Sequence, residues 1–126
     1  MKISALIQNN VFKESISEKM KKIGANIEFV DFQKPLHQQL KDTYIIINEF
    51  KVIDKKIIDN CSNLKLIQQS GIGIDNIDVQ HCTAKGIYVA NVPMANAISV
   101  AEHALFLMLY LAKNIKVKAN NDDRYS

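Results

Sequence analysis

The sequence is poor in residues that cross-link a chain or interrupt its helices and strands. It has two cysteines, two prolines, four glycines and no tryptophan among 126 residues. Cys61 and Cys82 form no C-x-x-C pair and no His/Cys ligand spacing, so we expect neither a disulfide nor a metal site, but reduced thiols of a cytoplasmic protein. The composition, 48% hydrophobic and 23% charged, is typical of a globular protein and shows no signature of disorder.

The chain also lacks a strong charge and a long apolar segment. Lysine and arginine number 16 against 13 acidic residues, which gives a net charge of +3. The cluster of Lys19, Lys21 and Lys22 is interpreted as a solvated helix face without aromatic platforms, so nucleic acid is not expected as a partner. No charged N-terminal segment leads into an apolar run, and the longest apolar run, residues 104–112, is about half of what a bilayer requires. We therefore expect neither a signal peptide nor a membrane contact.

Apolar runs typical of strands alternate with segments of helical pattern from the N-terminus onward. Gly24 follows the first amphipathic segment as a helix-ending glycine, and Asp78 precedes a later helix as its N-cap. The continuous apolar run at 44–47 is typical of a strand covered on both faces. Strands are expected at 3–7, 27–30, 44–47, 64–68 and 87–90, and helices at 13–23, after Pro35, at 54–61, at 78–86 and at 97–115.

This alternation predicts an α/β protein with right-handed crossovers and a doubly wound parallel sheet. Five such strands favour the flavodoxin-like order 2-1-3-4-5. The length suits one domain, which we place at 1–115, and the polar segment 116–126 is predicted to be a linker or tail.

The expected terminal helix is apolar around its whole circumference. Residues 104–112 read ALFLMLYLA, and just before them Ser99 and Glu102 have the spacing of a capping box. A helix without a polar face needs burial on both sides, and a sheet can cover only one of them. A second domain or a second subunit is therefore expected to cover it, and we predict a homodimer formed through this helix.

The segment 64–103 carries the features that point to chemistry. Two expected strands end in it, one at Ser70-Gly71-Ile72-Gly73 and the other at Asn91-Val92-Pro93. If these strands are parallel neighbours, both loops open at the carboxyl edge of the sheet, where α/β proteins bind ligands. Glycines at 71 and 73 would let the backbone turn tightly and bring N–H groups close to a small anion. The pattern predicts a carboxylate-binding loop.

The same segment resembles a known family. Its motifs read, in order, LKLIQQSGIGIDNID, KGIYVANVP and NAISVAEH. They resemble the substrate-binding, or catalytic, domain of the D-isomer-specific 2-hydroxyacid dehydrogenases, which include phosphoglycerate, glycerate, lactate and formate dehydrogenases. The resemblance implies an oxidoreductase that moves hydride between C2 of a small 2-hydroxy acid and NAD.

Matched one position at a time, the resemblance assigns roles to four residues. Ile72 and Gly73 stand where family members bind the substrate carboxylate through backbone N–H groups. Asn96 stands where an asparagine of formate-dehydrogenase-like members reaches the substrate, and Val100 where the family lines the nicotinamide. Each residue also has a local explanation, namely turn glycines, a helix cap at Asn96 and core packing at Val100.

The resemblance further implies what this chain does not carry. The arginine, acidic residue and histidine of the family's catalytic machinery belong to its nucleotide-binding domain and the segment that returns from it. We therefore expect a chain truncated before that domain and inactive alone. Gly71-Ile72-Gly73 cannot replace the family's G-x-G-x-x-G turn, because Asn76 occupies the place of the third glycine. The other candidate residues are interpreted as surface, interface or capping residues: His37, His81, Glu102 and His103.

Three other classes were weighed. A receiver domain needs paired acids after the first strand, where Gln8-Asn9-Asn10 stands, and a flavin module needs a phosphate loop there. A stronger alternative is a non-catalytic member of the family that acts as a binding or dimerisation module, like the corepressors built on the same scaffold. Met94 and Ala95 depart from the small Gly or Ser residues common in this loop of the family, so the identity of the hydroxy acid stays open, as does NAD against NADP.

Overall fold

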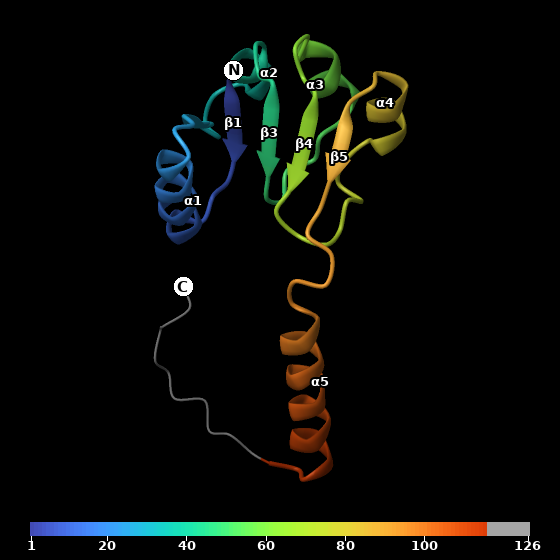
Figure 1. Ribbon diagram of the computed structural model, residues 1–126. Coiled ribbons are helices and arrows are strands. Elements are labelled where there is room, and N and C mark those ends of the chain that lie inside the picture. Colours follow the sequence, from blue (N-terminus) through green and yellow to red (C-terminus); the bar gives the residue numbers. More distant parts are fainter. Residues whose placement is uncertain (116–126) are drawn as a thin grey trace. The chain divides into compact units, whose positions relative to one another are not determined.

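The computed structural model describes residues 1–115, and the chain divides into two units, Met1–Ala95 and Asn96–Ser126. The first unit contains a five-stranded parallel sheet of order β2-β1-β3-β4-β5 (Figure 1), which confirms the predicted flavodoxin-like topology. The strands are β1 (Ile3–Leu6), β2 (Ile27–Phe29), β3 (Ile45–Asn48), β4 (Leu66–Gln69) and β5 (Tyr88–Ala90). The helices are α1 (Asn10–Lys22), α2 (Leu36–Leu40), α3 (Lys55–Asn60), α4 (Val79–Ala84) and α5 (Ala97–Ala112).

Helix α1 begins at Asn10, earlier than the start at residue 13 that its apolar pattern predicts. Asn9 is the N-cap, and its side-chain oxygen accepts a hydrogen bond from the Phe12 amide at 3.0 Å. A short polar side chain of this kind satisfies one of the free amides of the first turn, so the helix can start among polar residues. At the other end Gly24 has a φ of 69°, which confirms it as the helix-ending glycine.

Apolar side chains pack on both faces of the sheet. On one face α1 packs Phe12, Ile16 and Met20 against strand residues that include Ala5 and Ile47. The opposite face carries a larger cluster that joins the strands to α2, α3 and α4. Its buried members include Leu6, Leu40, Ile46, Ile58, Ile67 and Cys82. Burial on both sides accounts for the continuous apolar run of β3.

Both cysteines are buried as free thiols in the larger cluster. Burial raises the pKa of Cys61 to about 11, because a low-dielectric surrounding disfavours the thiolate. Burial, and then the charge of Asp78, also raises the pKa of Cys82. Cys61 is the C-cap residue of α3, so the prediction that Cys61 lies within the helix is wrong.

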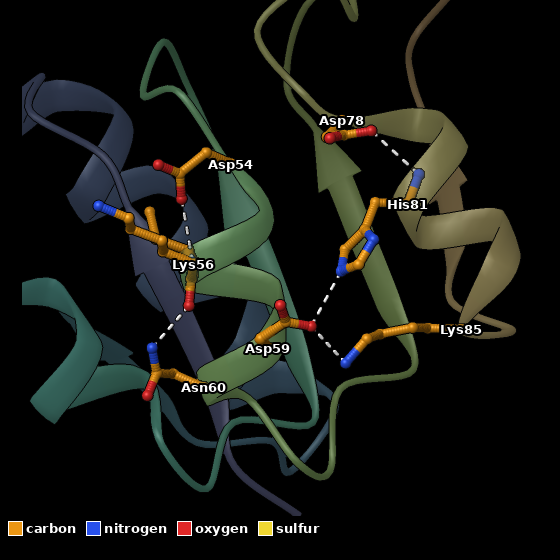
Figure 2. Close-up of polar contacts among 8 residues, drawn as sticks. Asp54, Lys56, Asp59, Asn60, Asp78, His81 and Lys85 are labelled. Carbon is orange, nitrogen blue, oxygen red and sulfur yellow. Dashed lines mark hydrogen bonds and ion pairs between the residues drawn. The ribbon is translucent and has the colours of Figure 1, made fainter.

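An ion-pair cluster joins α3 to α4 at the surface (Figure 2). Asp59 of α3 points toward His81 of α4 and toward Lys85, the C-cap residue of that helix. His81 Nε2 lies 2.9 Å from Asp59 Oδ1, and Lys85 Nζ is paired to the same oxygen. The bond to Lys85, and then the bond to His81, holds the pKa of Asp59 below its usual value. Asp78 caps α4 by accepting from the His81 amide at 2.9 Å, as predicted.

The second unit contains α5 as its element within the described residues. This helix begins at Ala97 with Asn96 as N-cap, so the predicted capping box is wrong. Because Ala97 and Ile98 already adopt helical geometry, Ser99 lies inside the first turn and cannot be the cap. Among residues 1–115 no helix is long and apolar enough to cross a membrane. The predicted tail, 116–126, lies outside the described residues.

Candidate functional site

Several loops of the first unit meet at the carboxyl edge of the sheet. Since the strands are parallel, β1, β3 and β4 end at the same edge, toward which their arrows point in Figure 1. Ligands of open α/β sheets bind at this edge. Helix α1 starts directly after β1, so the amino end of this helix belongs to the same edge.

The loop after β4 is held by its carbonyl groups and leaves its amides unused. The Val92 amide donates to the Gly71 carbonyl at 3.1 Å, and Asn91 Nδ2 donates to the Ile72 carbonyl at 2.7 Å. Within residues 1–115 the amides of Ile72 and Gly73 have no hydrogen-bond acceptor, and both residues are exposed. An unpaired exposed amide pair of this kind is a natural donor site for a carboxylate.

The glycines of this loop are not needed for a tight turn, contrary to the prediction. Neither Gly71 nor Gly73 has a left-handed φ, and a Cβ at Gly71 would meet nothing within 4 Å. A Cβ at Gly73 would stand 3.5 Å from Asp75 Oδ2, an ordinary contact. Glycine at these two positions leaves the backbone of the loop without side-chain cover. The exposed Asp75 carboxylate brings a negative charge to this loop, so the unpaired amides are the hydrogen-bond donors that the loop offers.

An open cavity of about 670 Å³ adjoins this loop and is lined in part by Gly71. Apolar side chains from α1 and from the loop after β3 form much of its wall, namely Val11, Phe12 and Phe50. Of the described residues lining the cavity, Glu49 alone carries a charge. The loop with its unpaired amides and the largely apolar cavity therefore adjoin each other at Gly71.

Glu49 is held rigidly by contacts that sequence patterns do not reveal. One oxygen of its carboxylate, Oε2, accepts from the amides of Gln8 at 2.8 Å and Asn9 at 3.5 Å. Its own amide donates to the Leu6 carbonyl at 3.2 Å, and its carbonyl accepts from Gln69 Nε2 at 2.9 Å. These contacts fix both the backbone and the carboxylate of Glu49 at the cavity wall.

Two buried polar residues support the loop after β3, which carries Glu49. Asn48 and Gln69 are almost fully buried, and Asn48 Nδ2 donates to Gln69 Oε1 and to the Lys51 carbonyl, both at 2.9 Å. Buried amides cost free energy unless they are paired, and this pair is satisfied. Polar residues at the ends of apolar strands were the available sequence signal for this network.

The other two predicted site residues, Asn96 and Val100, belong to the second unit. Asn96 is the N-cap of α5, but its side chain makes no capping hydrogen bond, so the local explanation of this residue as a side-chain cap is not supported. Val100 lies in the first turns of α5, and its amide donates to the Asn96 carbonyl at 2.9 Å. Just before them Met94 has a φ of 62°, a conformation that favours glycine.

From the sequence, no catalytic role is predicted for the three histidines or for Glu102, and the contacts of the described residues give no reason to assign one. His81 is engaged with Asp59 in the ion-pair cluster between α3 and α4. Residues 1–115 contain no group of His, Cys, Asp or Glu side chains that could hold a metal ion. Helix α4 begins only at Val79, and Asn76 Nδ2 donates to the Lys51 carbonyl at 2.9 Å, so Asn76 has a structural role.

Comparison with known proteins gives one consistent family. A family model described as "D-isomer specific 2-hydroxyacid dehydrogenase, catalytic domain" matches residues 5–122. A D-3-phosphoglycerate dehydrogenase of Archaeoglobus fulgidus is 34% identical over 116 residues, which cover 90% of this chain and 22% of that protein. The chain thus spans about a fifth of the length of this relative.

Solved structures show the same likeness. A 3-phosphoglycerate dehydrogenase of Entamoeba histolytica with bound NAD+ superposes with a TM-score of 0.75 at 26% identity, over 95% of this chain and 42% of that one. An NAD-dependent formate dehydrogenase of Staphylococcus aureus in complex with NAD gives a TM-score of 0.77 at 28% identity, over 90% of this chain and 39% of that one.

Proposed function

Given that this chain belongs to the D-isomer-specific 2-hydroxyacid dehydrogenases, we propose that it supplies the substrate-binding part of an NAD-dependent oxidoreductase acting on small D-2-hydroxy acids. The observation that carries the proposal is the amide pair of Ile72 and Gly73. These amides lie at the carboxyl edge of the parallel sheet and have no acceptor within residues 1–115. Family membership makes a 2-hydroxy or 2-oxo acid the ligand whose carboxylate they would receive.

The amide pair suits a carboxylate for a physical reason. A hydrogen bond to a charged group contributes about 1.5–3 kcal/mol, and two parallel donors also fix the plane of the carboxylate. Fixing the carboxylate places the neighbouring C2 carbon, whose hydrogen is transferred, within a small volume. On family position alone, we assign Asn96 a hydrogen bond to the substrate and Val100 a contact with the nicotinamide.

The described residues do not fit the dinucleotide part of NAD. A pyrophosphate site needs a strand, a turn with three spaced glycines and the start of a long helix. Gly71 and Gly73 are followed by Asn76 and by the six-residue helix α4. We infer that groups outside residues 1–115 bind the dinucleotide and supply the acid–base chemistry, so the 126 residues alone have no dehydrogenase activity.

Helix α5 supports a proposal about the partner. Residues 104–112, the C-terminal half of the helix, are all apolar except for the hydroxyl of Tyr110, and its own unit offers no other element among the described residues to cover them. Burying each large apolar side chain contributes about 1.5–3 kcal/mol, so such a helix favours association. We infer a homodimer that uses this helix.

A non-catalytic binding or dimerisation module is the second candidate. It is favoured by the same apolar helix, which association of two copies would bury. Both candidates require a working carboxylate site, and they differ in whether a nucleotide domain completes the enzyme. Activity measured after addition of such a domain would separate them.

The Gly73→Val variant tests the proposed carboxylate site. A valine there would crowd the amide pair while the fold tolerates a Cβ, so affinity for D-glycerate should fall at least ten-fold with an unchanged melting curve. Ile72→Val, which keeps the amide, should bind within about two-fold of the unaltered chain. The neutral D-glyceramide should not bind. Equal affinity of the Gly73→Val variant would refute the site.

A further inference from the structure

The cavity beside the carboxylate site indicates the chemistry of the substrate's other end. Gly71 belongs both to the loop that carries the free amides and to the wall of the 670 Å³ cavity. An acid whose carboxylate meets Ile72 and Gly73 can therefore extend its remaining carbons into this cavity. This step rests on the proposed function, because it takes the carboxylate position as given.

The wall of the cavity is matched to an uncharged tail. Val11 and Phe50 line it and are 76% and 78% exposed, although both are large apolar side chains. Covering them with an apolar group removes that surface from water, which favours binding. A charged group would lose its hydration against the same surface.

Glu49 opposes a second negative charge in two ways. Its carboxylate stands at the cavity wall, where it repels an anionic tail. It also occupies the amides of Gln8 and Asn9, at 2.8 and 3.5 Å, just before the start of α1. These two backbone amides precede the helix, and an anionic tail cannot use them because an internal carboxylate already accepts from them.

The nearby lysines are directed elsewhere. Lys13 Nζ lies 6.0 Å from the centre of the Phe29 ring, and Lys51 Nζ lies 4.7 Å from the centre of the Phe32 ring. Neither lysine is among the described residues that line the cavity. A phosphate in the cavity would therefore meet a carboxylate and no cation from this wall.

We propose that the cavity receives the uncharged, mainly apolar tail of a 2-hydroxy acid, and that Glu49 determines specificity by excluding acids with a phosphorylated tail. The proposal separates this chain from the phosphoglycerate substrate named for the Archaeoglobus fulgidus relative. Glu49 is a specificity-determining residue in this account and takes no part in hydride transfer.

A matched pair of ligands tests the proposal in the full 126-residue chain. D-glycerate and 3-phospho-D-glycerate differ only by the phosphate, and D-2-hydroxy-4-methylpentanoate adds an apolar tail. Amide NMR titrations should show the apolar acid binding most tightly and the phosphorylated acid on the order of ten-fold more weakly than glycerate. All three acids should shift the Gly73 amide resonance, and the acid with the apolar tail should also shift that of Phe50.

Glu49→Gln keeps the shape and a hydrogen-bond acceptor but removes the charge. It should strengthen phosphoglycerate binding on the order of ten-fold and leave D-glycerate within two-fold. Glu18→Gln, which removes the same charge at the surface pair with Lys22, should leave both affinities unchanged.

The possible failures are distinct. If phosphoglycerate binds most tightly and shifts the Gly73 amide, the carboxylate site stands and the assignment of Glu49 is overturned. The same holds if Glu49→Gln leaves the preference unaltered. If no acid shifts the Gly73 amide, the proposed function itself is overturned.

Discussion

Glu49 shows how far a residue's role depends on contacts remote in sequence. The partners of its carboxylate, Gln8 and Asn9, lie about forty positions earlier, and the glutamine that holds its carbonyl lies twenty positions later. A local pattern cannot reveal such contacts, and the sequence offered Asn48-Glu49 only as a strand end. Ile72 and Gly73 could be predicted as site residues from the sequence because their motif is local and contiguous.

Met94 allows a prediction about backbone strain. Its φ of 62° costs a non-glycine residue about 1–2 kcal/mol, whereas glycine loses about 0.5–1 kcal/mol through the unfolded chain. The side chain is 76% exposed, so its removal sacrifices little packing. Met94→Gly should therefore raise the free energy of unfolding by about 0.5–1 kcal/mol in urea titrations.

Met94→Ala is the matched control for this variant. Alanine removes the same exposed side chain but keeps a Cβ, so it should give no such gain. A stabilisation by alanine equal to that by glycine would show that the methionine side chain, and not its backbone conformation, is unfavourable.

At the scale of elements, the order and type of strands and helices were predictable and their ends less so. The alternation of apolar runs and helical segments suffices for the order 2-1-3-4-5, because parallel strands with short crossovers leave few other arrangements. The start of α1 was missed because Asn9 caps a first turn that carries little apolar pattern. The start of α5 was missed because Ser99 and Glu102 have capping-box spacing inside the helix.

The ion-pair cluster between α3 and α4 allows a prediction about acid stability. The pKa of Asp59 is lowered in the folded chain, so its charged form stabilises the fold above the unfolded pKa of about 4. This contribution is lost as the pH falls through the folded pKa. Asp59→Asn should therefore weaken the fall in the free energy of unfolding between about pH 5 and pH 3.

Asp42→Asn provides the comparison, because Asp42 has no ion pair among residues 1–115 and is exposed. Between about pH 5 and pH 3 the free energy of unfolding of this variant should fall as it does in the unaltered chain. If the free energy of unfolding falls equally with pH in both variants, the contact of Asp59 with His81 and Lys85 in Figure 2 contributes nothing to joining α3 and α4.

At the scale of the whole molecule, α5 predicts the association state. The chain of 14.3 kDa should sediment as a dimer at micromolar concentration, since the apolar residues 104–112 favour burial against a second copy. Leu107→Lys or Leu109→Lys should give monomer or aggregate, whereas Lys113→Glu at the end of α5 should remain dimeric. A soluble monomer of the unaltered chain in sedimentation equilibrium would contradict the inferred dimer.

Cofactor binding provides a second prediction at this scale. Because Asn76 and the short helix α4 replace the elements of a dinucleotide site, calorimetric titration with NADH should show no micromolar binding to the 126-residue chain. Micromolar binding would mean that the described residues hold the dinucleotide in a manner unlike a glycine turn at a helix start.

The central claim is that the loop after β4 binds the carboxylate of a 2-hydroxy acid through its backbone. Amide NMR spectra of the labelled chain during titration with D-glycerate test this claim most directly. We predict that the Ile72 and Gly73 amides show the largest, saturable downfield shifts, because they gain an anionic acceptor where residues 1–115 supply none. Saturable shifts confined to other residues, or none at those two amides, would contradict it.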